Sequence, residues 1–327
     1  MRGRNFFGRT FLGAGILISA FASHAADSSS ASSTVPSVTC SGEGTPKWNC
    51  KPTDIKIWLF DVPSSTQIVL ISHGTQGVDA RHFEYATALN RVGISAVVID
   101  HWTTRGIDKV HNDYAGNQSK GGRAPTMSWD SVMVQAWLRQ NHPQYLKFGY
   151  MGESMGGSSA INLAKWWPYN SLRRTLGVRA EPFDAEVALY PGCFDRAHDD
   201  RYTGKPFLFV LAEKDDDTPA THCVEYSAWM NARGGNATSA VMAGEHHDFD
   251  GPYAKQYWPK AQNPSQCTRM HEPDAIVWTK TGERFPRTPE GFAAILRQCT
   301  SWGITSGSTL DRHVAEPVWT KFFKEKL

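Results

Sequence analysis

Residues 152–156 (GESMG) carry the clearest chemical signal in this chain of 327 residues. The pattern Gly-x-Ser-x-Gly follows the apolar run 147–151 and precedes a helix-prone segment, which is the context of a nucleophile elbow. In such a strand-to-helix turn, the backbone and the helix come so close that a Cβ atom has no room beside the serine. We therefore predict that Ser154 is a nucleophile and that the N–H of Met155 faces a developing oxyanion.

A serine hydroxyl is a weak nucleophile unless a base removes its proton and an acid orients that base. With this type of elbow, the acid and then the histidine follow the serine along the chain. Acids come directly after the predicted strand 207–212, and Asp215 is the favoured partner, with Asp216 as the alternative. Asp216 and Asp217 are otherwise expected to be solvated acids or caps of the next helix.

The loop 243–250 (AGEHHDFD) contains two candidates for the base, His246 and His247. An imidazole can accept the serine proton and return it to a leaving group near neutral pH. Because the two histidines are adjacent, the residue types alone do not choose between them.

A second donor to the oxyanion is expected from the loop 71–77, which follows another predicted strand. The N–H of Thr75 is the candidate, and that of Gln76 is the alternative. A nucleophile, a base and backbone donors need no metal or organic cofactor, so we expect neither. The cluster 198–200 (HDD) has no second ligand set with the usual spacing of a metal site.

The elements that must position these residues alternate along the chain. Predicted strands are 55–60, 67–72, 95–100, 147–151, 185–190, 207–212 and 238–243. Predicted helices are 80–92, 127–141, 155–167, 219–233, 289–298 and 314–325. Nearly continuous apolar strands that alternate with helices indicate an α/β protein with a mostly parallel sheet covered on both faces.

The N-terminal residues predict export. Three arginines precede the apolar run 11–22, and Ser23-His24-Ala25 follows it, which is typical of a signal peptide over residues 1–25. The run is too short to span a bilayer about 30 Å thick, so no membrane anchor is expected after its removal. Residues 26–39 are rich in Ser and Ala and are expected to form a flexible leader, and residues 40–327 a single catalytic domain.

Charge and cysteine content narrow the partners and the compartment. The chain has 34 Lys+Arg against 32 Asp+Glu without a block of like charge, so no nucleic-acid partner is expected. All six cysteines follow residue 25, which fits a periplasmic or extracellular protein with three disulfides. Nearness in sequence favours the pairs Cys40–Cys50, Cys193–Cys223 and Cys267–Cys299.

Four further motifs are residues 100–107 (DHWTTRGI), 190–193 (YPGC), 212–219 (AEKDDDTP) followed by Cys223, and 247–250 (HDFD). In this order they resemble the dienelactone hydrolase-like group of α/β-hydrolases. The similarity covers residues 50 to 250, with a weaker likeness in 299–307. The resemblance implies an α/β-hydrolase fold, a mostly parallel, doubly wound sheet with helices on both faces.

The resemblance also implies roles for single residues. It places the base at His247 and the acid at Asp215, and it makes Trp102 and Arg105 candidates for the substrate pocket. For Arg105, a structural ion pair is an equal alternative. Dienelactone hydrolases use a cysteine nucleophile, whereas this chain has Ser154, so the resemblance favours a serine esterase acting on a small-molecule ester.

Two other classes of function share these features. A peptidase or an acyltransferase can use the same three residues, because neither fold nor triad defines the acyl acceptor. A secreted binding protein can keep the fold without catalysis. Turnover of amides or of added alcohols tests the first class, and failure to react with phosphonates indicates the second.

Overall fold

The computed structural model describes residues 30–41, 49–107, 117, 120–308 and 311–327. The signal peptide predicted for residues 1–25 and the first residues of the predicted leader lie outside this part of the chain. No helix among the described residues is long and apolar enough to cross a membrane.

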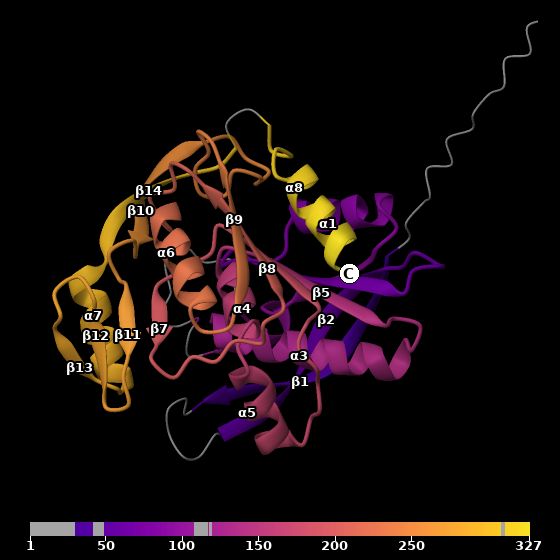
Figure 1. Cartoon of the computed structure of the whole chain (residues 1–327), viewed down its shortest axis with the longest axis horizontal. Helices are drawn as coiled ribbons and strands as arrows, with labels where there is room; N and C mark the ends of the chain where they lie inside the picture. Colours follow the sequence, from indigo (N-terminus) through magenta and orange to yellow (C-terminus); the bar gives the residue numbers. More distant parts are fainter. Residues whose placement is uncertain (1–29, 42–48, 108–116, 118–119, 309–310) are drawn as a thin grey trace, which may run out of the picture.

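An eight-stranded sheet forms the centre of the molecule (Figure 1). Its strand order is β1-β2-β4-β3-β5-β6-β8-β9. The strands are β1 (Ala31–Ser41), β2 (Asn49–Phe60), β3 (Gln67–Ser72), β4 (Ser95–Asp100), β5 (Lys147–Glu153), β6 (Ala185–Leu189), β8 (Pro206–Ala212) and β9 (Asn236–Met242). From β4 to β9 all neighbours are parallel, whereas β2 pairs antiparallel with both β1 and β4. Each of the seven strands expected from the sequence is present.

Helices cover both faces of this sheet. One face packs against α1 (Ala80–Arg91) and α8 (Glu316–Lys326), and the other against α3 (Ala124–Asn141), α4 (Met155–Leu163), α5 (Trp167–Leu176) and α6 (Ala220–Asn231). Successive residues of β3 alternate between the two cores, with Ile68 and Leu70 in one and Val69 and Ile71 in the other. This is why the central strands are continuously apolar in the sequence.

The helix expected over residues 155–167 is two helices. α4 ends at Leu163 and α5 begins at Trp167, with Pro168 in its first turn. Pro168 has no N–H for a bond to the preceding turn, so a single continuous helix would lose that bond. The short helix η1 (Thr103–Arg105) follows β4.

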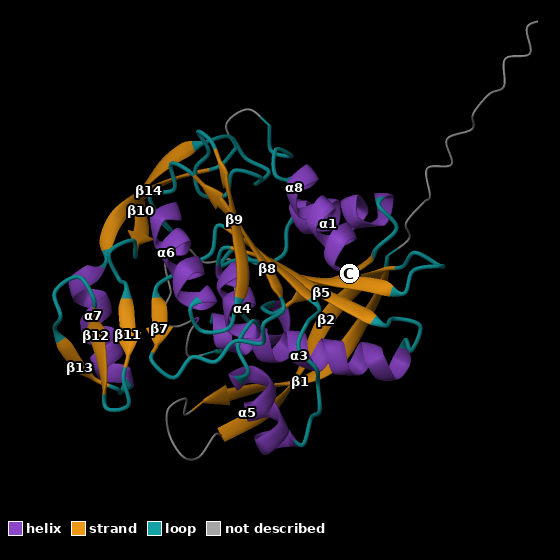
Figure 2. Ribbon diagram, in the orientation of Figure 1, coloured by secondary structure: helices purple, strands orange, loops and turns teal. Residues whose placement is uncertain are grey.

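Residues 256–306 form an additional unit, of which the sequence analysis predicted the helix 289–298 but none of the strands (Figure 2). It contains β10 (Gln256–Asn263), β11 (Arg269–His271), β12 (Ala275–Trp278), β13 (Arg284–Pro286), α7 (Pro289–Cys299) and β14 (Ser301–Ser306). β10 pairs with β14, and β7 (Asp195–Ala197) joins β11, β12 and β13 in a second sheet. Its own small core includes Ile276, Phe285 and Ile295. Strands of three or four residues are too short to show a periodic pattern, so sequence periodicity does not reveal them.

All three disulfides predicted from sequence proximity are present. Cys40–Cys50 joins β1 to β2 across the pair that the register places opposite each other. Cys193–Cys223 joins the segment after β6 to α6. Within the 256–306 unit, Cys267–Cys299 joins the segment between β10 and β11 to the end of α7.

The prediction of a flexible leader is wrong for residues 31–39, because they belong to strand β1. Val35 pairs with Ile55 of β2 and is fully buried, and the Ser37 hydroxyl donates to the Asp130 carboxylate on α3. The segment has few apolar residues of its own. It is ordered by the ladder with β2 and by a polar contact with a distant helix, and neither partner is visible in its local composition.

Val35→Ala is therefore expected to reduce the free energy of unfolding by about 2 kcal/mol, because it leaves a cavity under the sheet. The exposed neighbour Thr34 is the control, and Thr34→Ala is expected to cost less than about 0.5 kcal/mol. Urea unfolding of the oxidised proteins measures both. Equal values for the two variants would contradict the packing of β1.

Candidate active site

The predicted elbow lies where β5 ends at Glu153 and α4 begins at Met155. Ser154 has φ 50° and ψ −111°, in a region that side chains other than glycine rarely occupy. A Cβ on Gly152 would stand 2.2 Å from the Gly156 carbonyl oxygen, and one on Gly156 would stand 2.6 Å from the Ser72 carbonyl oxygen. Glycine is required at both flanking positions, and the turn holds the serine out at the end of the strand.

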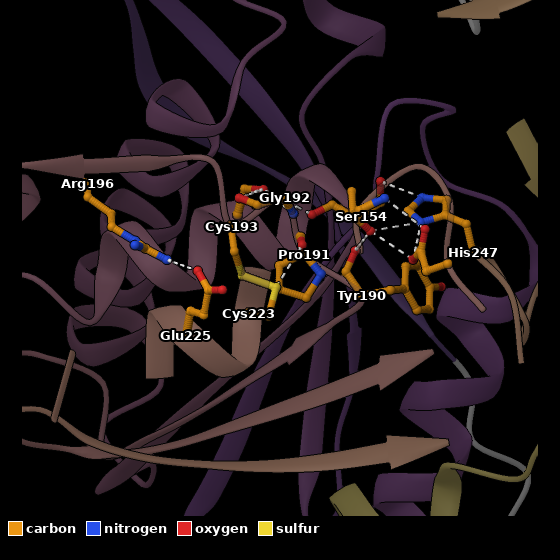
Figure 3. Close-up of a disulfide and its surroundings, with 12 residues drawn as sticks. Ser154, Tyr190, Pro191, Gly192, Cys193, Arg196, Cys223, Glu225 and His247 are labelled. Atoms are coloured by element: carbon orange, nitrogen blue, oxygen red, sulfur yellow. Dashed lines mark hydrogen bonds and ion pairs between the residues drawn. A yellow bond between two sulfur atoms is a disulfide. The ribbon is translucent and has the colours of Figure 1, made fainter. Parts of the chain in front are cut away.

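The imidazole of His247 connects Ser154 to Asp215. Its Nε2 lies 3.1 Å from the Ser154 Oγ, and its Nδ1 lies 2.9 Å from an Asp215 oxygen. Tyr190 packs its ring against the imidazole, and Figure 3 shows Ser154, Tyr190 and His247 together. The three candidate side chains, from loops after β5, β8 and β9, thus meet in one hydrogen-bonded chain.

The two alternatives left open by the residue types do not take part in this chain. The Nδ1 of His246 is buried and has no hydrogen-bond partner among the described residues. Asp216 is exposed, and its carboxylate accepts the N–H of Thr305 in β14.

The Asp215 carboxylate is held in place on both of its oxygens. One accepts the N–H groups of Asp217 and Thr218, at 2.9 and 2.7 Å, and the other accepts the Thr218 hydroxyl at 2.8 Å. Burial raises the pKa of this carboxyl, but the charge of His247 and these hydrogen bonds outweigh burial and lower it. Asp215 is therefore ionised at neutral pH and can hold the imidazole by its Nδ1.

A second carboxylate lies at the opposite nitrogen of His247. An oxygen of Asp217 is 3.5 Å from Nε2, and the side chain is largely buried. Asp217 is thus neither a solvated acid nor the cap of α6, whose N-cap is Pro219. Burial lowers the pKa of His247, but Asp215 and Asp217 outweigh burial and raise it above the ordinary value.

Buried side chains hold the loop that carries Thr75. The Glu153 carboxylate accepts the N–H of Gly74, and the Nδ1 of His73 lies 2.7 Å from the Gly74 carbonyl oxygen. His73 Nε2 accepts the N–H of His101, so its proton is on Nδ1 and is donated to that carbonyl. Burial, and then the charge of His101, lower the pKa of His73, so it stays neutral.

The next carbonyl of this loop is held as well, because the indole N–H of Trp102 donates to the Thr75 carbonyl at 3.2 Å. In a trans peptide the C=O and the N–H point in opposite directions, so holding the Gly74 and Thr75 carbonyls orients the N–H groups of Thr75 and Gln76. No acceptor for either N–H is found in the described part of the chain. Both predicted candidates for the second oxyanion donor are therefore available.

A buried ionic network supports the loop that follows His247. Arg81 is almost completely buried and donates to Asp79, Asp248 and Tyr190. Asp248 has φ 61°, and Tyr253 donates to its carboxylate. The sequence analysis did not identify Arg81. The signal that could have indicated it is Asp79, two residues earlier, because this acid caps α1 and accepts the N–H of Arg81.

Arg105 forms a structural ion pair, the second of its two expected roles. Both of its terminal nitrogens lie 2.8 Å from Asp130 oxygens, and only 2% of the side chain is exposed. It also donates to the hydroxyl of Thr39 in β1. A guanidinium committed to these partners is not available to a substrate. Trp102, by contrast, lies beside the Thr75 loop, with its ring 4.9 Å from that of His73.

No group of three or more His, Cys, Asp or Glu side chains that could hold a metal ion occurs among residues the structure describes. His198 faces Trp229, and Asp200 pairs with Lys165, so the HDD cluster is divided between two contacts.

Comparison with known proteins gives distant matches. No family model matches the chain. Two curated relatives, both uncharacterized proteins of Mycobacterium tuberculosis, are 29% identical over 180 residues, which is 50% of this chain and 58% of each relative. The chain thus matches less than two thirds of the length of these relatives.

Similar solved structures include an alpha-beta serine hydrolase homologue from Coxiella burnetii, with a TM-score of 0.39 and 14% identity over 61% of this chain and 86% of that chain. An esterase of Pyrobaculum calidifontis has a TM-score of 0.45 and 14% identity, with 68% of this chain and 78% of that chain covered. A thermophilic esterase of Thermogutta terrifontis has a TM-score of 0.47 and 14% identity, with 60% and 79% covered. With TM-scores below 0.5, none of them defines the reaction of this chain.

Arg105→Met is expected to reduce the free energy of unfolding by about 3 kcal/mol, because it leaves the Asp130 carboxylate buried without its cation. Arg91→Met is the matched control, since Arg91 pairs with Glu316 at the surface, and it is expected to cost less than about 1 kcal/mol. Urea unfolding measures the difference. A folded Arg105→Met variant of wild-type stability whose KM for an ester is raised would instead assign Arg105 to substrate binding.

Proposed function

We propose that this protein is an exported serine hydrolase of the α/β-hydrolase superfamily, similar to the dienelactone hydrolase-like group, that cleaves carboxylic esters. The observation that carries the proposal is the chain of contacts from Asp215 through His247 to Ser154, on an elbow whose serine has a positive φ. A strained, partly exposed serine with a base and an orienting acid has no evident structural purpose, and it is the arrangement that acyl transfer requires.

In the proposed reaction the Ser154 oxygen attacks the ester carbonyl carbon while its proton passes to His247 Nε2. The carbonyl oxygen becomes an oxyanion that accepts the N–H of Met155 and those of the Thr75 loop. His247 then returns the proton to the leaving alcohol, and the acyl group stays on Ser154. A water molecule, deprotonated by the same imidazole, releases the acid and restores the serine.

The strand order supports the same proposal. β5, β6, β8 and β9 are consecutive parallel neighbours, so the loops after β5, β8 and β9 emerge at one edge of the sheet. Ligands of open α/β sheets bind at the carboxyl ends of such strands. The three disulfides are compatible with folding in an oxidising compartment, which supports the proposed export.

A fluorophosphonate is expected to label Ser154 and no other serine of the oxidised, folded protein. Ser154→Ala is expected to lower the hydrolysis of nitrophenyl acetate by at least about a thousandfold, because the nucleophile is lost. His247→Gln is expected to have a similarly large effect, whereas the adjacent His246→Gln variant is the matched control and should stay within about threefold of the wild type.

Peptide mass spectrometry locates the label, and the absorbance of nitrophenol measures turnover. Absence of a label on Ser154 in folded wild-type protein would contradict the proposal and favour a binding protein. Faster turnover of amides, or acyl transfer to added alcohols, would replace the esterase by a peptidase or an acyltransferase on the same residues.

Trp102→Phe tests whether the indole positions the oxyanion loop. Removing the N–H that holds the Thr75 carbonyl is expected to lower kcat by about tenfold with KM little changed, because the interaction acts in the transition state. Trp129→Phe is the control, since it also removes a buried indole N–H bond, here to Ser171 of α5, and is expected to leave kcat unchanged. A raised KM with an unchanged kcat would instead make Trp102 a substrate contact.

A further inference from the structure

We propose that Asp217 makes the site selective for the charge of the leaving group, so that esters of cationic or neutral alcohols are cleaved and esters of anionic alcohols are disfavoured. The proposal rests on the serine hydrolase function proposed above and adds a substrate class to it. The observation behind it is the position of Asp217, which lies beside His247 although it is neither the acid nor the base of the triad.

The two nitrogens of His247 each face a carboxylate. Asp215 contacts Nδ1 at 2.9 Å, and an oxygen of Asp217 lies 3.5 Å from Nε2, the nitrogen that also reaches Ser154 Oγ at 3.1 Å. The backbone N–H of Asp217 donates to Asp215, so the backbone of Asp217 is fixed by the same short loop as the triad acid. Its side chain is 17% exposed, and its carboxylate lies against Nε2.

The geometry of proton transfer brings the leaving group close to this carboxylate. Nε2 must approach the leaving oxygen to about 3 Å in order to return the proton. The leaving oxygen and the Asp217 carboxylate oxygen lie about 3 and 3.5 Å from the same Nε2, so these two oxygens are at most about 6.5 Å apart. The alcohol portion of the substrate must therefore pass through the field of Asp217, whereas the acyl portion is attached to the serine.

Few positive charges offset that field. Among the described residues, His247 is the only cationic group within ion-pair distance of Asp217. After burial and His247, the largest effects on the Asp217 carboxyl come from the carboxylates of Asp215, Asp216 and Asp248, and Arg81 is already engaged with Asp79 and Asp248. When the imidazole is neutral, which is the form that accepts the serine proton, no cation among the described residues lies within ion-pair distance to offset the charge of Asp217.

Titration makes the selectivity depend on pH. Burial has the largest effect on the pKa of Asp217 and raises it. The charge of His247 lowers this pKa and the neighbouring carboxylates raise it, and the result is a pKa of about 7. A raised pKa means that the carboxyl is largely neutral below that pH and ionised above it. The preference for cationic over anionic alcohols is therefore stronger at pH of about 8 than at about 6.

The test compares three acetate esters of similar size whose alcohols are choline, the uncharged dimethylbutanol of the same shape, and the anion isethionate. For the wild type, kcat/KM is expected to fall from the cationic to the neutral and to the anionic ester, by about tenfold for each step at low salt. Asp217→Asn is expected to reduce each step to less than about twofold. The matched control is Asp216→Asn, which removes the same charge one residue away and keeps an oxygen for the Thr305 N–H.

A second readout uses nitrophenyl acetate, whose leaving group is the same for all variants. Because Asp217 contributes to the raised pKa of His247, the acidic limb of the kcat/KM profile is expected to move to lower pH in Asp217→Asn and to stay in place in Asp216→Asn. A merely structural role of Asp217 would lower the stability of the variant without moving this limb.

Equal rates for the three esters in the wild type, or the same order of rates in Asp217→Asn, would overturn the inference while leaving the hydrolase intact. Loss of charge preference in Asp216→Asn as well would assign the effect to net charge and also overturn it. If nitrophenyl acetate is not hydrolysed and Ser154 is not labelled, the hydrolase proposal fails, and the charge selectivity fails with it.

Discussion

The contact between the His247 imidazole and the Asp215 carboxylate is the interaction on which the rest of the site depends. It joins the loops after β8 and β9 and aims the other imidazole nitrogen at Ser154, at the end of β5. An imidazole can bridge two such partners only if both loops are held to within about 0.5 Å. Much of the buried polar structure around the site is understandable as the means of holding them.

Two supports act on the histidine loop. Arg81 reaches it from α1 through Asp248, and both groups are buried, so loss of either partner would leave a charge without compensation. On the other side, the N–H of Gly307 donates to the His247 carbonyl at the end of β14. The 256–306 unit is thereby attached to the backbone of the base itself.

The site concentrates negative charge around one imidazole. Asp215 and Asp217 face its two nitrogens, and both raise the pKa of His247 against the effect of burial. This environment favours the imidazolium that forms when the serine proton is taken up, and so stabilises charge at the moment it develops. The same environment reduces the neutral fraction of the base at low pH. An acidic site of this kind is best suited to substrates without negative charge near the leaving group.

Local sequence signals were sufficient for the elements and for the nucleophile. The apolar runs and the turn residues predicted the seven strands, and GESMG predicted the elbow at Ser154, because strand burial and the steric demand for glycine are properties of a few consecutive residues. Sequence proximity was sufficient for the three disulfides as well. The residue types did not distinguish His246 from His247, and only the family resemblance favoured the second.

Contacts between distant segments required the tertiary structure. β1 was expected to be a flexible leader because its composition is polar, yet it is held by β2 and by Asp130, 93 residues from Ser37. Arg105 was expected equally in a pocket or in an ion pair, and α3 supplies the carboxylate that engages it. Asp217 was expected to be a solvated acid or a helix cap, and only the approach of the β9 loop places it against His247. A residue's local pattern defines the element it belongs to, but the charge and burial of a side chain depend on segments that the fold brings to it.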